Sequence, residues 1–191
     1  MTIRPATPAD LADIQEIDGT IESSGYAHVE MAAGDDVAGQ SGATWTLGWR
    51  PAREKLILSS PLSDETLFML KQVVTGGDEG VALMAEHDGM AVALLLAQAD
   101  TVRQVMHILD LRVDSDIRRQ GIATVLLFQL IERAKEADLR AAYITTRTNN
   151  APVARLLEKL GWELSGIDTK RHDNHDLVKE SATLMWYYVI K

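Results

Sequence analysis

Polar and apolar positions near the start of the chain predict a short strand at 2–4 followed by a helix. Thr7 caps this helix, Pro8 takes its first position, and Asp10 lies where a negative charge favours the helix dipole. Apolar residues then recur at helical spacing and form one buried stripe, consisting of Leu11, Ile14 and Ile17.

A second helix and a three-stranded meander come next. The helix runs from Ser63 to about Val74 and ends at a Gly-Gly pair. Three apolar runs predict the strands, at 81–86, 90–98 and 105–113. An Asp-Gly pair between the first two runs is a strong hairpin signal.

The rest of the chain alternates helices and strands. An amphipathic helix is predicted from about Arg119 to Ala137, a strand at 141–146, a helix from Asn150 to Leu160, and strands at 162–168 and 183–190. The long helix is expected to pack inward through Val125, Leu126, Phe128, Leu130, Ile131 and Ala134. This order of elements predicts one mixed α/β domain over residues 1–191.

Residues 19–50 have a weaker pattern, because Gly, Ser, Ala and Asp dominate them. We expect an irregular or partly helical segment there, followed by a short helix at 52–56. Segments of this kind often shape the substrate site of small transferases. Trp45 and Trp49 are interpreted as packing residues or as part of a substrate pocket.

Composition excludes several classes of protein. The chain has no cysteine, which rules out disulfides, thiolate catalysis and cysteine-ligated metal. The N-terminus lacks the apolar core of a signal peptide, and the longest apolar run, Met90 to Ala97, is too short to span a membrane. We therefore expect a cytoplasmic protein that does not bind membranes.

The net charge of −9 argues against a nucleic-acid partner, because such proteins need basic surface to neutralise phosphates. The same charge favours a cationic partner or substrate. A role in keeping the protein soluble explains the negative net charge equally well.

The turn after the third meander strand carries the clearest chemical signal. The strand ends near Val113, a polar loop follows, and the long helix opens around the small residues Gly121 and Ala123. The first amides of a helix have no partner within it, and with the helix dipole they form an anion site. Arg118 and Arg119 add positive charge, which suits a pyrophosphate. The alternative is an ordinary strand–loop–helix crossover whose helix begins with basic residues and binds no anion.

Three segments together resemble the GNAT superfamily of N-acetyltransferases. Arg118-x-x-Gly121-x-Ala123 matches the family's Arg/Gln-x-x-Gly-x-Gly/Ala signature, and 110–113 is similar to its fourth strand. Residues 150–162 resemble its Asn-x-x-Ala-x-x-Leu-Tyr-x-Lys-x-Gly-Phe segment. Gly166-x-Asp168-Thr169 and the closing Trp186-Tyr187-Tyr188 are similar to streptothricin acetyltransferases, which acetylate an amine of a cationic antibiotic.

The resemblance implies a mixed, mostly antiparallel sheet, splayed between its fourth and fifth strands and flanked by helices. Acetyl-coenzyme A is the implied cosubstrate, bound by a core at about 81–168. Its pantetheine arm would bond the backbone of Leu111 and Val113, and its pyrophosphate the amides of 118–123. The implied cofactor-binding residues are Leu111, Arg112, Val113, Arg118, Arg119, Gln120, Gly121, Ile122, Ala123, Thr124 and Asn150. Family members are frequently dimers, so a homodimer is allowed.

The implied reaction is direct attack of a small-molecule amine on the thioester. Asp110, on the strand beside the expected thioester, is the first candidate for the general base; ordering of the strand is its alternative role. The family's leaving-group acid is a Tyr at the position of Leu157, and leucine cannot donate a proton. Tyr187 and Tyr188 are the candidates to replace this acid, and Tyr187 is named as the catalytic residue. For each of them, packing in the core or at the rim is the alternative role.

Two alternative functions remain open, and a third possibility, a metal site, is not favoured. One is a weakly active or non-catalytic acyl-CoA-binding module, motivated by Leu157, and another is an acetyltransferase for peptides or proteins. The third concerns His172-Asp173-Asn174-His175-Asp176, which we interpret as a polar loop at the substrate mouth rather than a zinc site, so no metal is expected. His107 is interpreted as a core or rim histidine.

Overall fold

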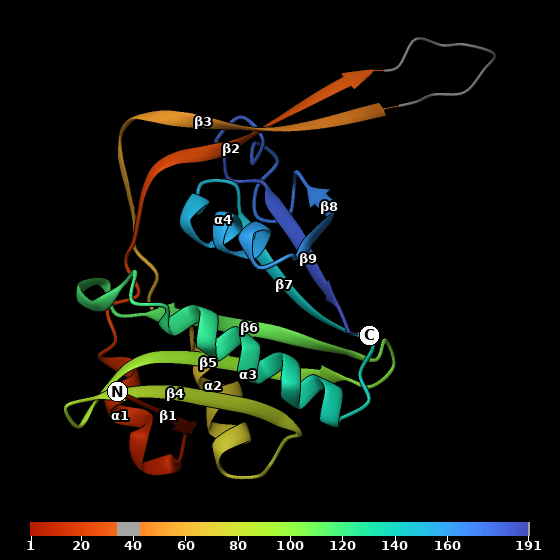
Figure 1. Ribbon diagram of the computed structural model, residues 1–191. Coiled ribbons are helices and arrows are strands. Elements are labelled where there is room, and N and C mark those ends of the chain that lie inside the picture. The colour runs from red at the N-terminus through yellow and green to blue at the C-terminus, as the bar shows by residue number, and fades with distance from the viewer. Residues whose placement is uncertain (34–42, 191) are drawn as a thin grey trace.

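The computed structural model describes residues 1–33 and 43–190, which form two β-sheets and the helices around them (Figure 1). A seven-stranded sheet has the order β1-β4-β5-β6-β7-β9-β8, and β2 and β3 form a separate two-stranded sheet. The strands are β1 Thr2–Pro5, β2 Ile21–Ala33, β3 Ala43–Leu58, β4 Gly80–His87, β5 Met90–Asp100, β6 Val105–Val113, β7 Ala141–Arg147, β8 Glu163–Asp168 and β9 Thr183–Val189. The α-helices are α1 Leu11–Gln15, α2 Asp64–Val74, α3 Ile122–Glu136 and α4 Ala151–Lys159.

The large sheet is mixed and mostly antiparallel, as predicted. Strands β1, β4, β5 and β6 pair antiparallel in turn, and β7, β9 and β8 do the same. The contact between β6 and β7 joins these two groups and is parallel. A parallel pair needs a crossover connection, and α3 supplies it.

Alternation along the strands supplies apolar side chains to both faces of the sheet. In β4, Leu83 and Ala85 join the cluster that packs under α3 and α4, whereas Ala82 and Met84 join the cluster under α1 and α2. Figure 1 shows α3 lying across one face of β4, β5 and β6. Both faces of the meander are therefore covered, which explains its nearly continuous apolar sequence.

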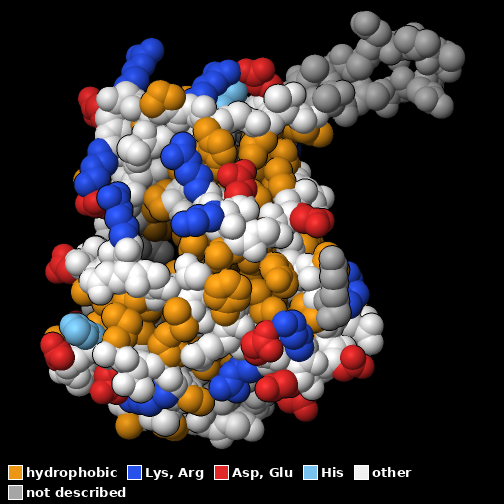
Figure 2. Space-filling model, viewed as in Figure 1, with side chains coloured by type: hydrophobic (Ala, Val, Ile, Leu, Met, Phe, Trp, Pro, Cys, Tyr) orange, Lys and Arg blue, Asp and Glu red, His pale blue; other side chains and the backbone are white. Residues whose placement is uncertain are grey.

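The buried stripe of α3 differs from the predicted one. Leu126, Leu130, Ile131 and Ala134 are buried as expected, together with Ile122 and Leu127. Val125 and Phe128 are 45% and 50% exposed, so their assignment to the core was wrong. They flank the stripe, and Figure 2 shows hydrophobic side chains gathered over this helix. Apolar character alone cannot separate the centre of a helical stripe from its flank.

The prediction for residues 19–50 was also wrong. Strands β2 and β3 form a long antiparallel hairpin, and the helix expected at 52–56 is part of β3. Gly25 lies at a register shift where an added Cβ would be 2.6 Å from the Arg50 carbonyl oxygen, so glycine is needed for this close approach. Ala27 and Val29 face the core, and the Ala27 N–H donates to the Thr148 carbonyl at 2.8 Å. Long-range packing, not local propensity, makes this hairpin.

Among the helices that the structure describes, none combines the length and the apolar character needed to cross a bilayer.

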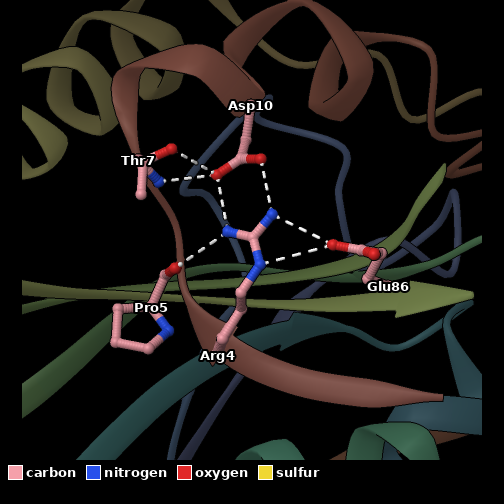
Figure 3. Close-up of polar contacts among 5 residues, drawn as sticks. All are labelled: Arg4, Pro5, Thr7, Asp10 and Glu86. Carbon is pink, nitrogen blue, oxygen red and sulfur yellow. Dashed lines mark hydrogen bonds and ion pairs between the residues drawn. The ribbon is translucent and has the colours of Figure 1, made fainter. Parts of the chain in front are cut away.

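A polar network ties the start of the chain to the sheet (Figure 3). The Arg4 guanidinium in β1 donates two hydrogen bonds of 2.8 Å to Asp10 and bonds of 3.1 and 3.3 Å to Glu86 in β4. The Asp10 carboxylate also accepts from the N–H and the hydroxyl of Thr7, each at 2.7 Å. Asp10 therefore secures the first helical turn and β1 at the same time.

Replacing Asp10 with Asn tests this network. The Arg4 guanidinium, and then Thr7, hold the pKa of Asp10 well below its usual range. Its stabilising contribution is therefore present above the unfolded pKa of about 3.9 and is lost as the pH falls through the lower folded value. We expect Asp10→Asn to lower the free energy of unfolding by about 1–2 kcal/mol near neutral pH.

Urea unfolding of both proteins at neutral and at acidic pH measures this, with the exposed Asp13→Asn as control. The difference between wild type and Asp10→Asn should shrink in acid. A difference that is independent of pH would contradict the assignment.

Candidate functional site

The hydrogen-bond ladder between β6 and β7 ends halfway along β6. Val105 to Ile108 pair with Ala141 to Ile144, and no pairing to β7 continues along residues 109–113. From there β6 stays with β5 and β7 stays with β9. Figure 1 shows the two strands diverging from their paired ends. A gap therefore opens inside the sheet, as the resemblance implied.

A β-bulge marks the point of divergence. Ala97 pairs with Ile108 and Leu96 with Asp110, so Leu109 is the extra residue in β6. Before the bulge, Met106 and Ile108 pack in the cluster under α3; after it, Leu111 and Val113 do. The bulge thus shifts the alternation by one residue and turns Asp110 and Arg112 to the opposite face.

Asp110 and Arg112 form a buried ion pair on that face. The Arg112 Nε and Nη2 atoms donate to the two Asp110 carboxylate oxygens, each at 2.7 Å. A third donor, Nη1, reaches the Ser60 carbonyl at 3.2 Å, and Arg112 is 6% exposed. Both carboxylate oxygens of Asp110 therefore already accept a hydrogen bond from Arg112. Two residues that are two apart in a strand share a face, and this signal could have revealed the pair from the sequence.

Backbone groups of β6 point into the gap. The Asp114 N–H donates to the Val92 carbonyl of β5 at 2.9 Å. Amide direction alternates along an antiparallel strand, so Leu111 and Val113 direct their N–H and C=O groups away from β5. The Val113 carbonyl accepts from Arg118 Nε at 2.9 Å. Among the described residues, no hydrogen bond across the gap is found to the N–H of Val113 or to the backbone groups of Leu111, so these groups are suited to bind a ligand.

Arg118 shapes the loop after β6. In addition to the Val113 carbonyl, its guanidinium donates to the carbonyls of Thr20 and Asp18. The Ser115 N–H also donates to the Asp18 carbonyl at 3.1 Å. The side chain of Arg118 thus ties the loop to the N-terminal segment, and Arg118 also lines the cavity described below.

Two left-handed residues end the loop, so α3 begins later than predicted. Arg119 has φ 64° and Gly121 has φ 82°, and the helix starts at Ile122. The left-handed conformation costs a non-glycine residue about 1–2 kcal/mol, which makes Arg119 strained. The N–H groups of 122–124 form the open first turn of α3. A Cβ on Gly121 would meet no atom within 4 Å, so the space beside these amides is open.

A cavity of about 690 Å³, here called the cradle cavity, joins the gap to this loop. It is lined by ten of the eleven predicted cofactor residues; Gln120 is in the loop but does not line it. The sequence did not indicate its other walls, which come from 19–22, Ser60 and the α4 side chains of Pro152, Val153, Leu156 and Lys159. Figure 2 shows the surface hollowed between α4 and the start of α3, with Lys and Arg side chains at the border.

Two further cavities adjoin the cradle cavity. The inner cavity, of about 340 Å³, is lined by Glu65, His107, Asp110 and Arg171 among others. The outer cavity, of about 670 Å³, lies against the base of the β2–β3 hairpin and the end of β7. Asn150 lines all three cavities, and its buried Oδ1 atom has no hydrogen-bond partner among the described residues. An unpaired buried acceptor is costly, so Asn150 is suited to a ligand that crosses this junction.

His107 borders the inner cavity and begins an aromatic stack. Its ring lies 4.9 Å from that of Tyr143, which lies 4.8 Å from that of Tyr187. Burial, followed by the charge of Arg171, lowers the pKa of His107 from its ordinary 6.5. Tyr187, the predicted catalytic tyrosine, lines none of the three cavities and serves in the stack.

Leu157 faces the core instead of a cavity. In α4 the buried residues are Ala151, Ala154 and Leu157, whereas Leu156 lines the cradle cavity. Leu157 is 0% exposed, so its side chain does not meet the space where a leaving group is expected.

The loop at 172–176 is held by its own hydrogen bonds. Asp176 is buried and accepts from the His172 N–H at 2.9 Å, which lowers the pKa of Asp176. Lys179 donates to Asp173 at 2.7 Å and lowers its pKa to about 2. Within the described ranges no three His, Cys, Asp or Glu residues are grouped as metal ligands.

Comparisons with known proteins agree with this geometry. Residues 47–162 match the model of the acetyltransferase (GNAT) family. Streptothricin acetyltransferase A of Bacillus subtilis (strain 168) is 31% identical over 79 residues, which are 41% of this chain and 45% of that protein.

Solved structures show the same fold at low identity. A nourseothricin acetyltransferase has a TM-score of 0.77 and 18% identity, over 100% of this chain and 98% of its own. A candidate streptothricin acetyltransferase of Bacillus anthracis, in complex with acetyl coenzyme A, has a TM-score of 0.70 and 18% identity, over 98% of each chain. The ribosomal-protein-S18-alanine N-acetyltransferase of Escherichia coli has a TM-score of 0.64 and 18% identity, over 100% of this chain and 94% of its own.

Gly121→Ala tests the cradle cavity. The methyl group would enter the open space beside the first-turn amides and would strain a residue with φ 82°. We expect roughly tenfold weaker coenzyme A binding or worse, with a stability loss of about 1 kcal/mol. Calorimetric titration measures the affinity and urea unfolding the stability.

Gly89→Ala is the matched control, because Gly89 has φ 80° and equally open surroundings in the turn between β4 and β5. It should lose similar stability and keep its affinity. Equal affinity in the two variants would place the ligand elsewhere.

Proposed function

Because the chain belongs to the GNAT family of acetyltransferases, we propose that it transfers the acetyl group of acetyl-coenzyme A to a primary amine of a small molecule. The observation that carries this proposal is the cradle cavity, which unites an open strand edge with an open helix start. A pantetheine arm needs amide partners along an extended path, and a diphosphate needs convergent N–H groups. Residues 111–113 offer the amide partners along an extended path, and residues 119–124 offer the convergent N–H groups.

The reaction joins the cradle cavity to the inner cavity. The nitrogen of a neutral amine attacks the thioester carbonyl carbon, a C–N bond forms, and the C–S bond breaks to release the coenzyme A thiolate. The proton that the amine loses passes to a base and, by way of solvent, to the sulfur. The N–H of Leu111 is suited to stabilise the carbonyl oxygen as it gains charge. Leu111, Asp110 and Asn150 border both cavities, at the place where the amine and the thioester would meet.

We assign the proton acceptor to His107 in place of Asp110. Asp110 already binds Arg112 through both oxygens. His107 lines the inner cavity, and its lowered pKa keeps the imidazole neutral at physiological pH. A neutral imidazole is a competent base, and loss of such a group typically costs 10²–10⁴-fold in rate. In this scheme Asp110 positions Arg112 and β6.

The acceptor is proposed to be small. The inner cavity, of about 340 Å³, is closed on one side by α2, which favours a compact amine over a folded protein. A streptothricin-like antibiotic is a candidate, since a streptothricin acetyltransferase is 31% identical over 79 residues.

A thiol-release assay with acetyl-coenzyme A tests the proposal, using small amines, streptothricin and peptide N-termini as acceptors. We expect turnover with small amines, acetylated products by mass spectrometry, and loss of turnover in Gly121→Ala. Tight coenzyme A binding without any acetylated product would identify a binding module instead.

His107→Gln and Asp110→Asn distinguish the two bases. At neutral pH, His107→Gln should lower kcat/KM by about 10²-fold without changing acetyl-coenzyme A affinity. In the wild type, protonation of His107 below its pKa, which lies under 6.5, should lower kcat/KM beyond the fall that protonation of the amine causes, and this additional acid limb should vanish in His107→Gln. Asp110→Asn should retain the limb while losing stability. The reverse pattern would make Asp110 the base.

A further inference from the structure

The cavities beside the cradle cavity differ in charge. The inner cavity has two carboxylates, Glu65 from α2 and Asp110 from β6. The outer cavity has two guanidinium groups, Arg147 and Arg171, and no carboxylate among the described residues that line it. Arg171 stands between the two cavities and borders both. Asp110 is paired with Arg112, so Glu65 and Arg171 nearly balance in the inner cavity, and a ligand that spans the two cavities would pass from a nearly neutral end to a basic end.

Uncommitted polar groups line the basic end. Thr183 is 2% exposed, and its hydroxyl has no hydrogen-bond partner among the described residues. The buried Oδ1 atom of Asn149 is likewise without a partner within the described part of the chain, but as an acceptor it needs a donor from the ligand and does not itself favour an anion. A hydroxyl can donate to an anion, and leaving it unpaired costs about 1–3 kcal/mol. A bound polar group would remove this cost.

The walls between the two ends include apolar residues. Ile21 and Leu58, from the base of the β2–β3 hairpin, line the outer cavity, and Pro61 lies beside them. They suit a methylene or ring segment that separates two charged groups.

We propose that the acceptor carries, opposite its reacting amine, an anionic group that Arg147 and Arg171 bind. This inference rests on the proposed acetyl transfer and names the class of its acceptor. Guanidinium groups match carboxylate and phosphate oxygens in geometry as well as in charge. A second ammonium in the outer cavity would face both arginines and be repelled. The net charge of −9, which favoured a cationic substrate, describes the whole chain and not this cavity.

Matched acceptors test the charge of the distal group. An ω-amino acid series of increasing chain length is compared with the corresponding amides, diamines and aminophosphonates, at a pH where His107 is neutral. At the best length we expect kcat/KM for the anionic acceptors to exceed that of the amide by roughly tenfold and that of the diamine by more. The preference should weaken at high salt, because both arginines are exposed. A preference for the diamine or for streptothricin overturns the inference.

Arg147→Gln and Arg171→Gln test the two side chains. Arg147→Gln should raise KM for the anionic acceptor by roughly tenfold, leaving kcat, acetyl-coenzyme A affinity and turnover of the amide nearly unchanged. Arg171→Gln should raise the same KM by a similar factor, but loss of its charge also weakens the lowering of the His107 pKa, so its kcat is compared with the wild type well above that pKa. Arg133→Gln, in the last turn of α3 and outside all three cavities, removes the same charge as a control. Unchanged KM in both cavity variants overturns the inference.

A binding measurement separates this inference from the proposed function. If no amine is acetylated although coenzyme A binds, the proposed transfer fails. Calorimetric titration of the ω-amino acid into the coenzyme A complex then decides the inference by itself. Binding that needs the anion and both arginines supports it, and absence of binding overturns it.

Discussion

An amide ladder that stops at Ile108 is the constraint on which the rest of the site depends. Strands in a sheet normally satisfy each other's backbone groups, and an unpaired buried amide is costly. Here β6 leaves β7 after four paired residues, and the extra residue Leu109 redirects the strand. Within the described part of the chain, the backbone of Leu111 then has no strand partner across the gap. The backbone hydrogen bonds between β6 and β7 therefore end at the position where a pantetheine arm would supply hydrogen bonds instead.

Side chains of residues close to the gap hold it open. Arg112 joins β6 to Ser60 before α2, and Arg118 joins the loop after β6 to carbonyls at 18 and 20. Both arginines donate hydrogen bonds to carbonyl or carboxylate oxygens of the protein. Arg112 is paired with Asp110, whereas Arg118 binds only neutral carbonyls and keeps its charge. The positive character of the cradle cavity therefore comes from the helix start together with Arg118, Arg119 and Lys159. The strained backbone of Arg119 is consistent with a loop shaped for a ligand rather than for stability.

The charge around each cavity is set by the side chains that line it, and the net charge of −9 for the whole chain does not predict it. Basic side chains outnumber acidic ones in the cradle cavity, arginines without carboxylates line the outer cavity among the described residues, and the inner cavity has both signs of charge. Coulomb interactions in a partly enclosed cavity depend on the nearest groups, because solvent and salt screen the distant ones. Recognition of an acceptor is therefore governed by a few side chains that remote segments bring together.

The sequence by itself determined the meander, the helices and the position of the cradle, because these features arise from neighbouring residues. The turn at 118–123 needs only a glycine, a strand end and a helix start, all adjacent in the chain. Tertiary structure alone decided that β2 and β3 pair as a hairpin, that Leu157 faces the core, and that Glu65, Asn149, Arg147, Arg171 and Thr183 line the inner and outer cavities. No local pattern marks those residues, since each is ordinary in its own segment. Their meeting depends on where the two halves of the sheet diverge, and divergence is a property of strand pairing rather than of any one strand.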